Sequence, residues 1–169
     1  MIRENKYMDT QNFSISYETY DEIEQLSATD KMLCLKAKDA LASSHSPYSK
    51  FKVGTAILLA DGQIILGSNQ ENVAYPSGIC AERVALFYIG SNNPKAVIKT
   101  MAITAQTDQF KIKNPVTSCG GCLQVMIEAE KRQNSQIEVL FYCIDGKILK
   151  VNSVKSLLPF GFVEDRLGA

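Results

Sequence analysis

A chain of 169 residues is long enough for one domain with its own hydrophobic core. Its content of 46% hydrophobic and 21% charged residues is typical of a folded globular protein and argues against a disordered chain. The 18 basic residues are balanced by 18 acidic ones, so the chain lacks the positive excess that nucleic-acid binders carry, and we expect no nucleic-acid partner.

The N-terminal residues and the apolar runs give expectations about location. No run approaches the roughly 20 apolar residues of a membrane span, and the first ten residues hold no apolar core of a secretory signal. We therefore expect a cytoplasmic protein with no membrane partner. Residues 1–12 are polar and are predicted to form a flexible lead, followed by a single domain over residues 13–169.

The first half of the chain is predicted to hold an edge strand, a helix and a hairpin. Residues 13–17 alternate between apolar and polar side chains, which is typical of a short strand. The helix begins at residues 27–30, which resemble a capping box, and ends before Pro47. Two apolar rows over residues 51–66, separated by Asp-Gly at 61–62, predict the hairpin.

Helices and strands alternate in the second half. The predicted elements are a helix over 80–89, a strand over 96–105, a helix over 121–132, a strand over 137–144, and a short last helix between Ser153 and Pro159. This order predicts an α/β fold in which one antiparallel hairpin is joined to parallel crossovers, with helices packed on the faces of the sheet.

Three cysteines carry the strongest chemical signal. Cys119 and Cys122 form a C-x-x-C pair that can place two sulfurs on one metal ion, and Cys80 is the evident third ligand. Three protein ligands and a water are the pattern of a catalytic rather than a structural zinc site. We predict that Cys34 and Cys143 are ordinary buried cysteines.

Glu82 follows the first of these cysteines by two residues at the start of a predicted helix. A carboxylate there lies beside a metal without binding it and can move protons between water and substrate, as in zinc deaminases. Three thiolates give the site a negative charge that makes a bound water less acidic. Two helix N-termini and the neighbouring Arg83, a candidate donor to a thiolate, can offset that charge.

Other interpretations of these residues remain. A lone C-x-x-C also occurs in redox pairs and in structural zinc knuckles, although a thioredoxin-like pair should open the first helix after an early strand, and this one lies late. The only histidine, His45, precedes a proline turn without a partner at ligand spacing, so we expect a loop residue.

Several segments together resemble the small cytidine deaminases, the type that binds zinc through three cysteines and assembles as homotetramers. The matching segments are 46–54, 69–72, 80–83, 119–125 and 157–162. The resemblance implies a mixed five-stranded sheet sandwiched between helices. It also implies zinc on Cys80, Cys119 and Cys122, with Glu82 as the proton carrier for hydrolytic deamination of cytidine or deoxycytidine in pyrimidine salvage.

The same resemblance assigns substrate contacts. Asn69 and Glu71 would hydrogen-bond the ribose hydroxyls, Phe51 would pack against the pyrimidine ring, and the backbone N–H of Ala81 would hold the base carbonyl. Phe162 would reach the site of a neighbouring subunit. Without the resemblance, Asn69 and Glu71 could be solvated loop residues, and the two phenylalanines could belong to the core.

Two positions depart from the family pattern, and other functions remain open. Ser118 stands where the family usually has Pro, and Leu123 where it usually has Arg, but neither change touches a ligand or Glu82. The alternatives are a deaminase of another aminated pyrimidine nucleoside such as blasticidin S, a non-catalytic zinc-binding module, and a polynucleotide editor. The paired Asn69 and Glu71 favour a plain nucleoside, while Glu82 and the neutral net charge argue against the last two.

Overall fold

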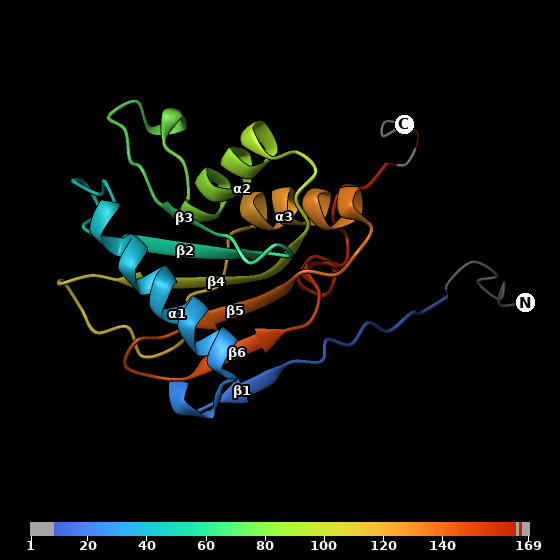
Figure 1. The fold of residues 1–169 in the computed structure, drawn as a ribbon, viewed down its shortest axis with the longest axis horizontal. Helices are drawn as coiled ribbons and strands as arrows, with labels where there is room; N and C mark the ends of the chain where they lie inside the picture. Colours follow the sequence, from blue (N-terminus) through green and yellow to red (C-terminus); the bar gives the residue numbers. More distant parts are fainter. Residues whose placement is uncertain (1–8, 165, 167–169) are drawn as a thin grey trace, which may run out of the picture.

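The computed structural model describes residues 9–164 and 166, which form a sheet with helices on both faces. Its strand order is β1-β6-β5-β4-β2-β3. Helix α1 covers one face, and α2 and α3 lie together on the other (Figure 1). The strands are β1 (Glu18–Tyr20), β2 (Lys52–Leu59), β3 (Ile64–Ser68), β4 (Ile98–Gln106), β5 (Glu138–Tyr142) and β6 (Ile148–Val151). The helices are α1 (Ala28–Ala40), α2 (Ala81–Asn92) and α3 (Gly120–Gln133).

The predicted hairpin and crossovers are confirmed. Strand β2 pairs antiparallel with β3 on one side and with β4 on the other, so β3 and β4 run in the same direction although they are not neighbours. Strands β4 and β5 pair in parallel. Helix α2 therefore connects β3 to β4, and α3 connects β4 to β5, as crossovers between strands of equal direction.

Alternation along the central strands divides the buried side chains between two cores. Ile57, Met101 and Val139 pack under α2 and α3. Their chain neighbours Ala56, Ala102 and Leu140 pack under α1, because successive side chains of a strand point to opposite faces. The central strands are thus covered on both sides, as the predicted α/β fold requires.

The start of α1 follows the predicted capping pattern. The Ser27 side chain accepts a hydrogen bond of 3.1 Å from the backbone N–H of Asp30, which satisfies one donor of the first turn. Leu33, Cys34 and Ala37 lie on the buried face of the helix and are fully covered by the sheet. Capping and helical spacing therefore place this helix correctly from the sequence.

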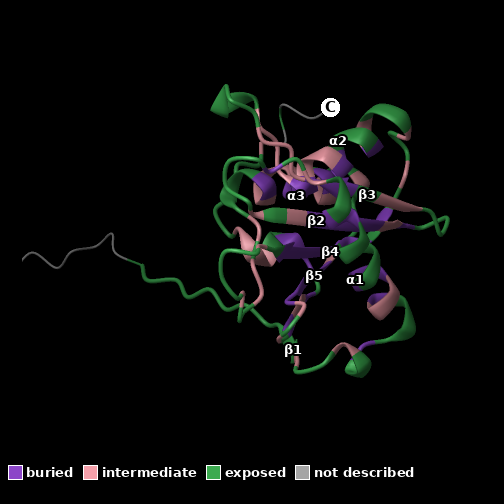
Figure 2. Cartoon of the chain, turned by 90° about the vertical axis from the view of Figure 1, so that its left-hand side faces the viewer, coloured by how far each residue is buried: buried purple, intermediate pink, exposed green. Residues whose placement is uncertain are grey.

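Two details of the predicted fold are wrong. Residues 13–17 are not a strand: β1 begins at Glu18, and the preceding segment is exposed (Figure 2). The reason is that β6 pairs only with Glu18–Tyr20, which leaves residues 13–17 without a neighbouring strand. The sheet has six strands rather than five, since the chain turns back after β5 and forms β6 beside it. The predicted short last helix is present as the 3₁₀ helix Val154–Leu157, with Ser153 as its N-cap.

The ends of the chain bear on two further expectations. Of the predicted flexible lead, residues 1–8 lie outside the described residues, and residues 9–12 are exposed without regular secondary structure. The division into a lead and a single domain stays a prediction. Among the described residues, no helix combines the length and the apolar character needed to cross a membrane.

Candidate metal and substrate site

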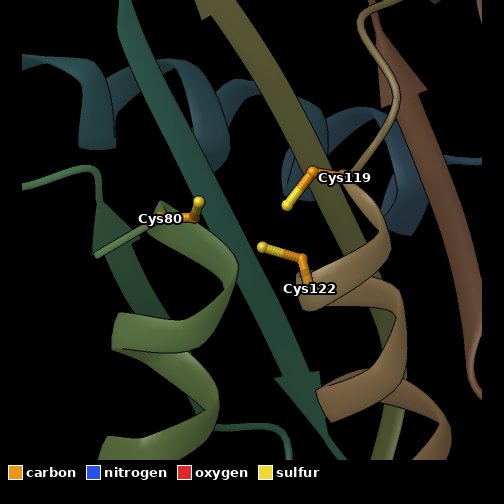
Figure 3. A group of neighbouring side chains, drawn as sticks. All are labelled: Cys80, Cys119 and Cys122. Atoms are coloured by element: carbon orange, nitrogen blue, oxygen red, sulfur yellow. The ribbon is translucent and has the colours of Figure 1, made fainter. Parts of the chain in front are cut away.

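The three predicted cysteine ligands meet at the adjoining N-termini of two helices. Cys80 is the N-cap of α2, Cys119 is the N-cap of α3, and Cys122 lies in the first turn of α3. Figure 3 shows the three side chains pointing toward one another, and their sulfurs all lie within 4.8 Å of one another. This spacing suits three ligands of one tetrahedral zinc ion.

A glycine in β3 sets how closely α2 approaches the sheet. A Cβ atom on Gly67 would lie 2.4 Å from the carbonyl oxygen of Ala81 and 2.9 Å from the backbone nitrogen of Ala85. Both atoms belong to the helix backbone and cannot move aside, so only glycine allows this approach. Gly67 therefore fixes the first turn of α2, and with it Cys80 and Glu82, against the strand.

The surroundings of the cluster stabilise negative charge. Hydrogen bonding from the Cys122 thiol, assisted by Arg83, lowers the pKa of Cys80 to about 6. The pKa of Cys122 is raised, because its proton is held on Cys80 and because the group is buried. The guanidinium of Arg83 donates to the Cys80 sulfur over 3.7 Å.

The Nε atom of the Arg83 guanidinium shows whether the surroundings fit a metal–thiolate cluster. The Arg83 Nε is buried and has no hydrogen-bond partner among the described residues. A buried donor without a partner is costly, and a further thiolate or a bound ligand would satisfy it. Three sulfurs at two helix N-termini beside the half-buried Arg83 form a donor set for a soft divalent metal such as zinc.

Glu82 lies beside the cluster without belonging to it. It is the second residue of α2 and is only 4% exposed. It lines a cavity of ≈ 950 Å³ that is also lined by Cys80, Cys119 and Arg83. A carboxylate in this position can exchange protons with a water or ligand in the cavity.

Asn69 lines the same cavity, but most of its amide is used by the protein. Its Oδ1 accepts from the Val53 N–H at 2.8 Å and from the Ser44 hydroxyl at 2.6 Å. Its Nδ2 donates to the Phe51 carbonyl at 2.9 Å. An amide nitrogen carries two hydrogens, so one remains for a ligand.

Glu71 also lines the cavity and is held by the neighbouring turn. One carboxylate oxygen accepts from the backbone N–H groups of Tyr48 at 2.9 Å and Ser49 at 3.2 Å. Hydrogen bonds from the Ser49 side chain and from these two backbone groups lower the pKa of Glu71. The ionised carboxylate keeps acceptor capacity for a hydroxyl-bearing ligand.

Four predicted site residues are not among those that line this cavity: Phe51, Ala81, Phe162 and the buried Cys122. Phe51 is half-buried, and its ring stacks on Phe110 with centroids 6.3 Å apart. Ala81 is fully buried in the first turn of α2, where backbone N–H groups have no helical partner. Phe162 is 70% exposed near the C-terminus.

The remaining singled-out residues lie where the sequence places them. Cys34 and Cys143 are buried, at 0% and 2% exposure. His45 is an exposed loop residue. Its backbone donates to the Asn69 carbonyl at 3.0 Å and accepts from the Glu71 N–H at 2.7 Å, so it supports the loop that carries these two side chains.

Sequence reasoning missed contacts between residues far apart in the chain. Ser44 and Phe110 support Asn69 and Phe51, and nothing in their local sequence indicates it. The Gln124 side chain both donates to the Phe162 carbonyl and accepts from its N–H, each at 2.8 Å. Only the close approach of α2 to β3 could have been predicted, because a glycine inside a strand, here Gly67, often marks a close backbone approach.

Comparisons with known proteins agree with this geometry. Residues 27–136 match the family described as "Cytidine and deoxycytidylate deaminase zinc-binding region". The chain is 37% identical over 135 residues to a cytidine deaminase of Halalkalibacterium halodurans, covering 80% of this chain and 95% of that protein. It is also 37% identical to a cytidine deaminase of Sporosarcina psychrophila, covering 80% of this chain and 92% of the relative.

Solved structures resemble the fold as well. The crystal structure of a cytidine deaminase from Burkholderia pseudomallei superposes with a TM-score of 0.67 at 34% identity, covering 81% of this chain and all of that one. A cytidine deaminase from Mycobacterium tuberculosis gives a TM-score of 0.60 at 25% identity, covering 82% of this chain and 100% of the other.

Proposed function

The chain belongs to the cytidine deaminase family, and from this premise we propose that it hydrolyses cytidine or deoxycytidine to uridine or deoxyuridine and ammonia. The observation that carries the proposal is the cluster of Cys80, Cys119 and Cys122 beside the buried Glu82, which lines one cavity together with Cys80 and Cys119. A structural zinc site has no need of such a carboxylate. The family match and the donor set together support zinc as the cofactor.

The residues of the site have separate roles in this reaction. The three thiolates would hold zinc, which when bound supplies Lewis-acid activation of water. Glu82 takes a proton from the attacking water and delivers it to the ring nitrogen next to the carbon that bears the amine. The same carboxylate then transfers the second proton to the leaving ammonia, so it ends the cycle ionised as it began.

Substrate contacts form the second part of the proposal. Asn69, through its remaining amide hydrogen, and Glu71, through its carboxylate, bind the sugar hydroxyls. Ala81 is proposed to donate its backbone N–H to the base carbonyl, and Phe51 to pack at the side of the pyrimidine. The position of Asn69 and Glu71 on the cavity wall supports their contacts with the sugar. The free backbone N–H groups at the start of α2 support the contact between Ala81 and the base carbonyl.

Arg83 tunes the charge of the thiolates rather than binding substrate. Its contact of 3.7 Å with the Cys80 sulfur withdraws negative charge from the ligand set. We expect Arg83→Gln to keep zinc but to lower kcat by about tenfold, since loss of one charge-assisted hydrogen bond costs about 1.5 kcal/mol. Metal analysis beside steady-state kinetics checks this. Unchanged turnover in the zinc-loaded variant would show that Arg83 has no such role.

A homotetramer is the proposed assembly, as in the resembling family. Exposed aromatic residues support an interface on the helical face: Phe87 and Tyr88 on α2 are 52% and 54% exposed. A groove of ≈ 740 Å³ lined by α2 and α3 lies beside them. Phe162 is proposed to reach a neighbouring subunit's site. Exposed aromatic side chains beside a groove are compatible with a protein interface.

Sedimentation equilibrium tests the assembly. We expect a mass four times the 18.7 kDa of one chain at micromolar concentration. A single-chain mass across the accessible concentration range would contradict the proposal, and Phe162 would then have no neighbouring site to reach.

The cellular setting belongs to the same proposal. Five free cysteines without a disulfide suit a reducing compartment, which supports the cytoplasm. The balance of 18 basic and 18 acidic residues supports a small-molecule substrate and no nucleic-acid partner. We also propose no membrane partner.

Product analysis tests the reaction and its substrate class. Zinc-loaded protein is incubated separately with cytidine, deoxycytidine and blasticidin S, and ammonia and nucleoside products are quantified. We expect one ammonia per uridine or deoxyuridine formed. Turnover of blasticidin S alone would move the function to the alternative substrate, and no ammonia from any of the three would refute the proposal.

A further inference from the structure

The loop over residues 107–119, between β4 and α3, lies beside the site at both of its ends. Its last residues, Val116, Thr117 and Cys119, line the substrate cavity, and Cys119 is a proposed zinc ligand. Its first part carries Phe110, whose ring stacks on that of Phe51 with centroids 6.3 Å apart and an interplanar angle of 29°. Phe110 has no place in the reaction described above.

Phe51 ends the turn that holds Glu71. The backbone N–H groups of Tyr48 and Ser49, at the start of the turn, donate to the Glu71 carboxylate. The Phe51 N–H in turn donates to the Ser49 hydroxyl at 3.0 Å. A displacement of Phe51 would therefore be transmitted to the donors that orient the carboxylate.

Asn69 is tied to the same segment. It donates to the carbonyl of Phe51 and accepts from the N–H of Val53, at 2.9 and 2.8 Å. These two bonds join the amide to Phe51 and to the second residue after it, so the orientation of the Asn69 amide follows the position of the Phe51 backbone. Both cavity-lining side chains thus depend on one short segment.

This segment needs support from outside. Lys50 has φ +56°, a left-handed conformation that is unfavourable for a residue with a side chain and persists only where the surroundings enforce it. Tyr48 is 59% exposed and offers little packing. The Phe110 loop is itself anchored to the end of β5, because the Cys143 thiol donates to the Ile112 carbonyl at 3.4 Å.

We infer that Phe110 is a positioning residue: its ring, held by an anchored loop, fixes Phe51 and the turn over residues 48–51, and thereby orients Asn69 and Glu71 toward the sugar hydroxyls of a bound nucleoside. The identity of that ligand rests on the proposed function, whereas the positioning of the turn does not. Phe110 acts through Phe51 and touches no reacting atom.

The first test measures the turn without any ligand. Amide hydrogen exchange of Tyr48, Ser49 and Val53 is followed in the zinc-loaded wild type and in Phe110→Ala. We expect exchange at these three amides to be about 2- to 10-fold faster in the variant, the range that corresponds to one aromatic pair. Phe13→Ala is the matched control, because Phe13 is 57% exposed and Phe110 58%, yet Phe13 lies in the segment before β1.

The second test separates binding from chemistry. Phe110→Ala should raise KM for cytidine by about 2- to 10-fold while kcat changes by less than about twofold. The increase should largely disappear with 2′,3′-dideoxycytidine, which lacks the hydroxyls that Asn69 and Glu71 are proposed to bind. Phe110→Tyr, which keeps the stacked ring, should restore the wild-type KM. A general loss of structure would affect both substrates equally.

The outcomes distinguish this inference from the proposed function. Unchanged exchange at Tyr48, Ser49 and Val53 in Phe110→Ala overturns the positioning role, whatever the protein hydrolyses. Faster exchange in Phe110→Ala, together with a wild type that is inert toward cytidine, would confirm the positioning of the turn and refute the proposed function. An equal rise in KM for cytidine and dideoxycytidine would overturn the orientation of Asn69 and Glu71 toward the sugar.

Discussion

Replacing Glu82 with Gln is expected to lower kcat for cytidine by about 10²–10⁴-fold, the usual contribution of a general acid–base group. Glutamine has the shape of glutamate and can keep one hydrogen bond, but it cannot accept and return a proton. Glu82 is 4% exposed and lies outside the cysteine cluster, so the substitution should leave zinc bound. The expected result is therefore a folded, metal-loaded and nearly inactive protein.

A matched carboxylate gives the control for this result. Glu24 is exposed and forms a surface ion pair with Lys31 at 3.1 Å, and such pairs contribute little. Glu24→Gln should keep wild-type kinetics. If Glu82→Gln retains more than about a tenth of wild-type kcat, well above the loss expected for a general acid–base group, another residue must carry the protons.

Replacing Cys119 with Ser is expected to weaken zinc binding by about 10²–10³-fold. Zinc binds thiolate and imidazole sites with about 10–16 kcal/mol, so one of its ligands accounts for about 3–4 kcal/mol, and a neutral hydroxyl is a poor substitute. Cys119 is exposed, so the change should not disturb the core. Metal analysis after dialysis against a competing chelator measures the loss, and deaminase activity should fall with the zinc content.

A buried cysteine outside the cluster gives the second control. Cys143→Ser keeps a donor for the Ile112 carbonyl and should bind zinc like the wild type. Wild-type zinc content in both Cys119→Ser and Cys143→Ser would contradict the assignment of the metal site. An equal loss of zinc in both would indicate that the metal responds to stability rather than to ligation.

Local patterns predicted most of what positions the site. The Ser27 cap, the Asp-Gly turn before β3 and the periodicity of the central strands were confirmed because each depends on residues close together in the chain. The cysteine cluster was predictable for a different reason: two motifs each open a helix, and the crossovers bring both helix N-termini to one edge of the sheet. The chemistry of the cluster followed from its spacing.

The errors and omissions arise from pairing between distant segments. Residues 13–17 have the alternation of a strand, but a strand also requires a neighbour, and β6 pairs with the chain only from Glu18 onward. The stacking of Phe110 on Phe51 and the two bonds between Gln124 and Phe162 join residues 38 or more positions apart. No local pattern predicts such contacts, since they depend on how the loops lie after folding.

The central claim is most directly tested by ultraviolet absorbance after cytidine is added to zinc-loaded wild type and to zinc-loaded Glu82→Gln protein. We expect the absorbance of cytidine to fall as uridine forms with the wild type, and to stay constant over the same time with the variant. An unchanged absorbance with zinc-loaded wild type would contradict cytidine deamination. An equal fall in both samples would contradict the role of Glu82.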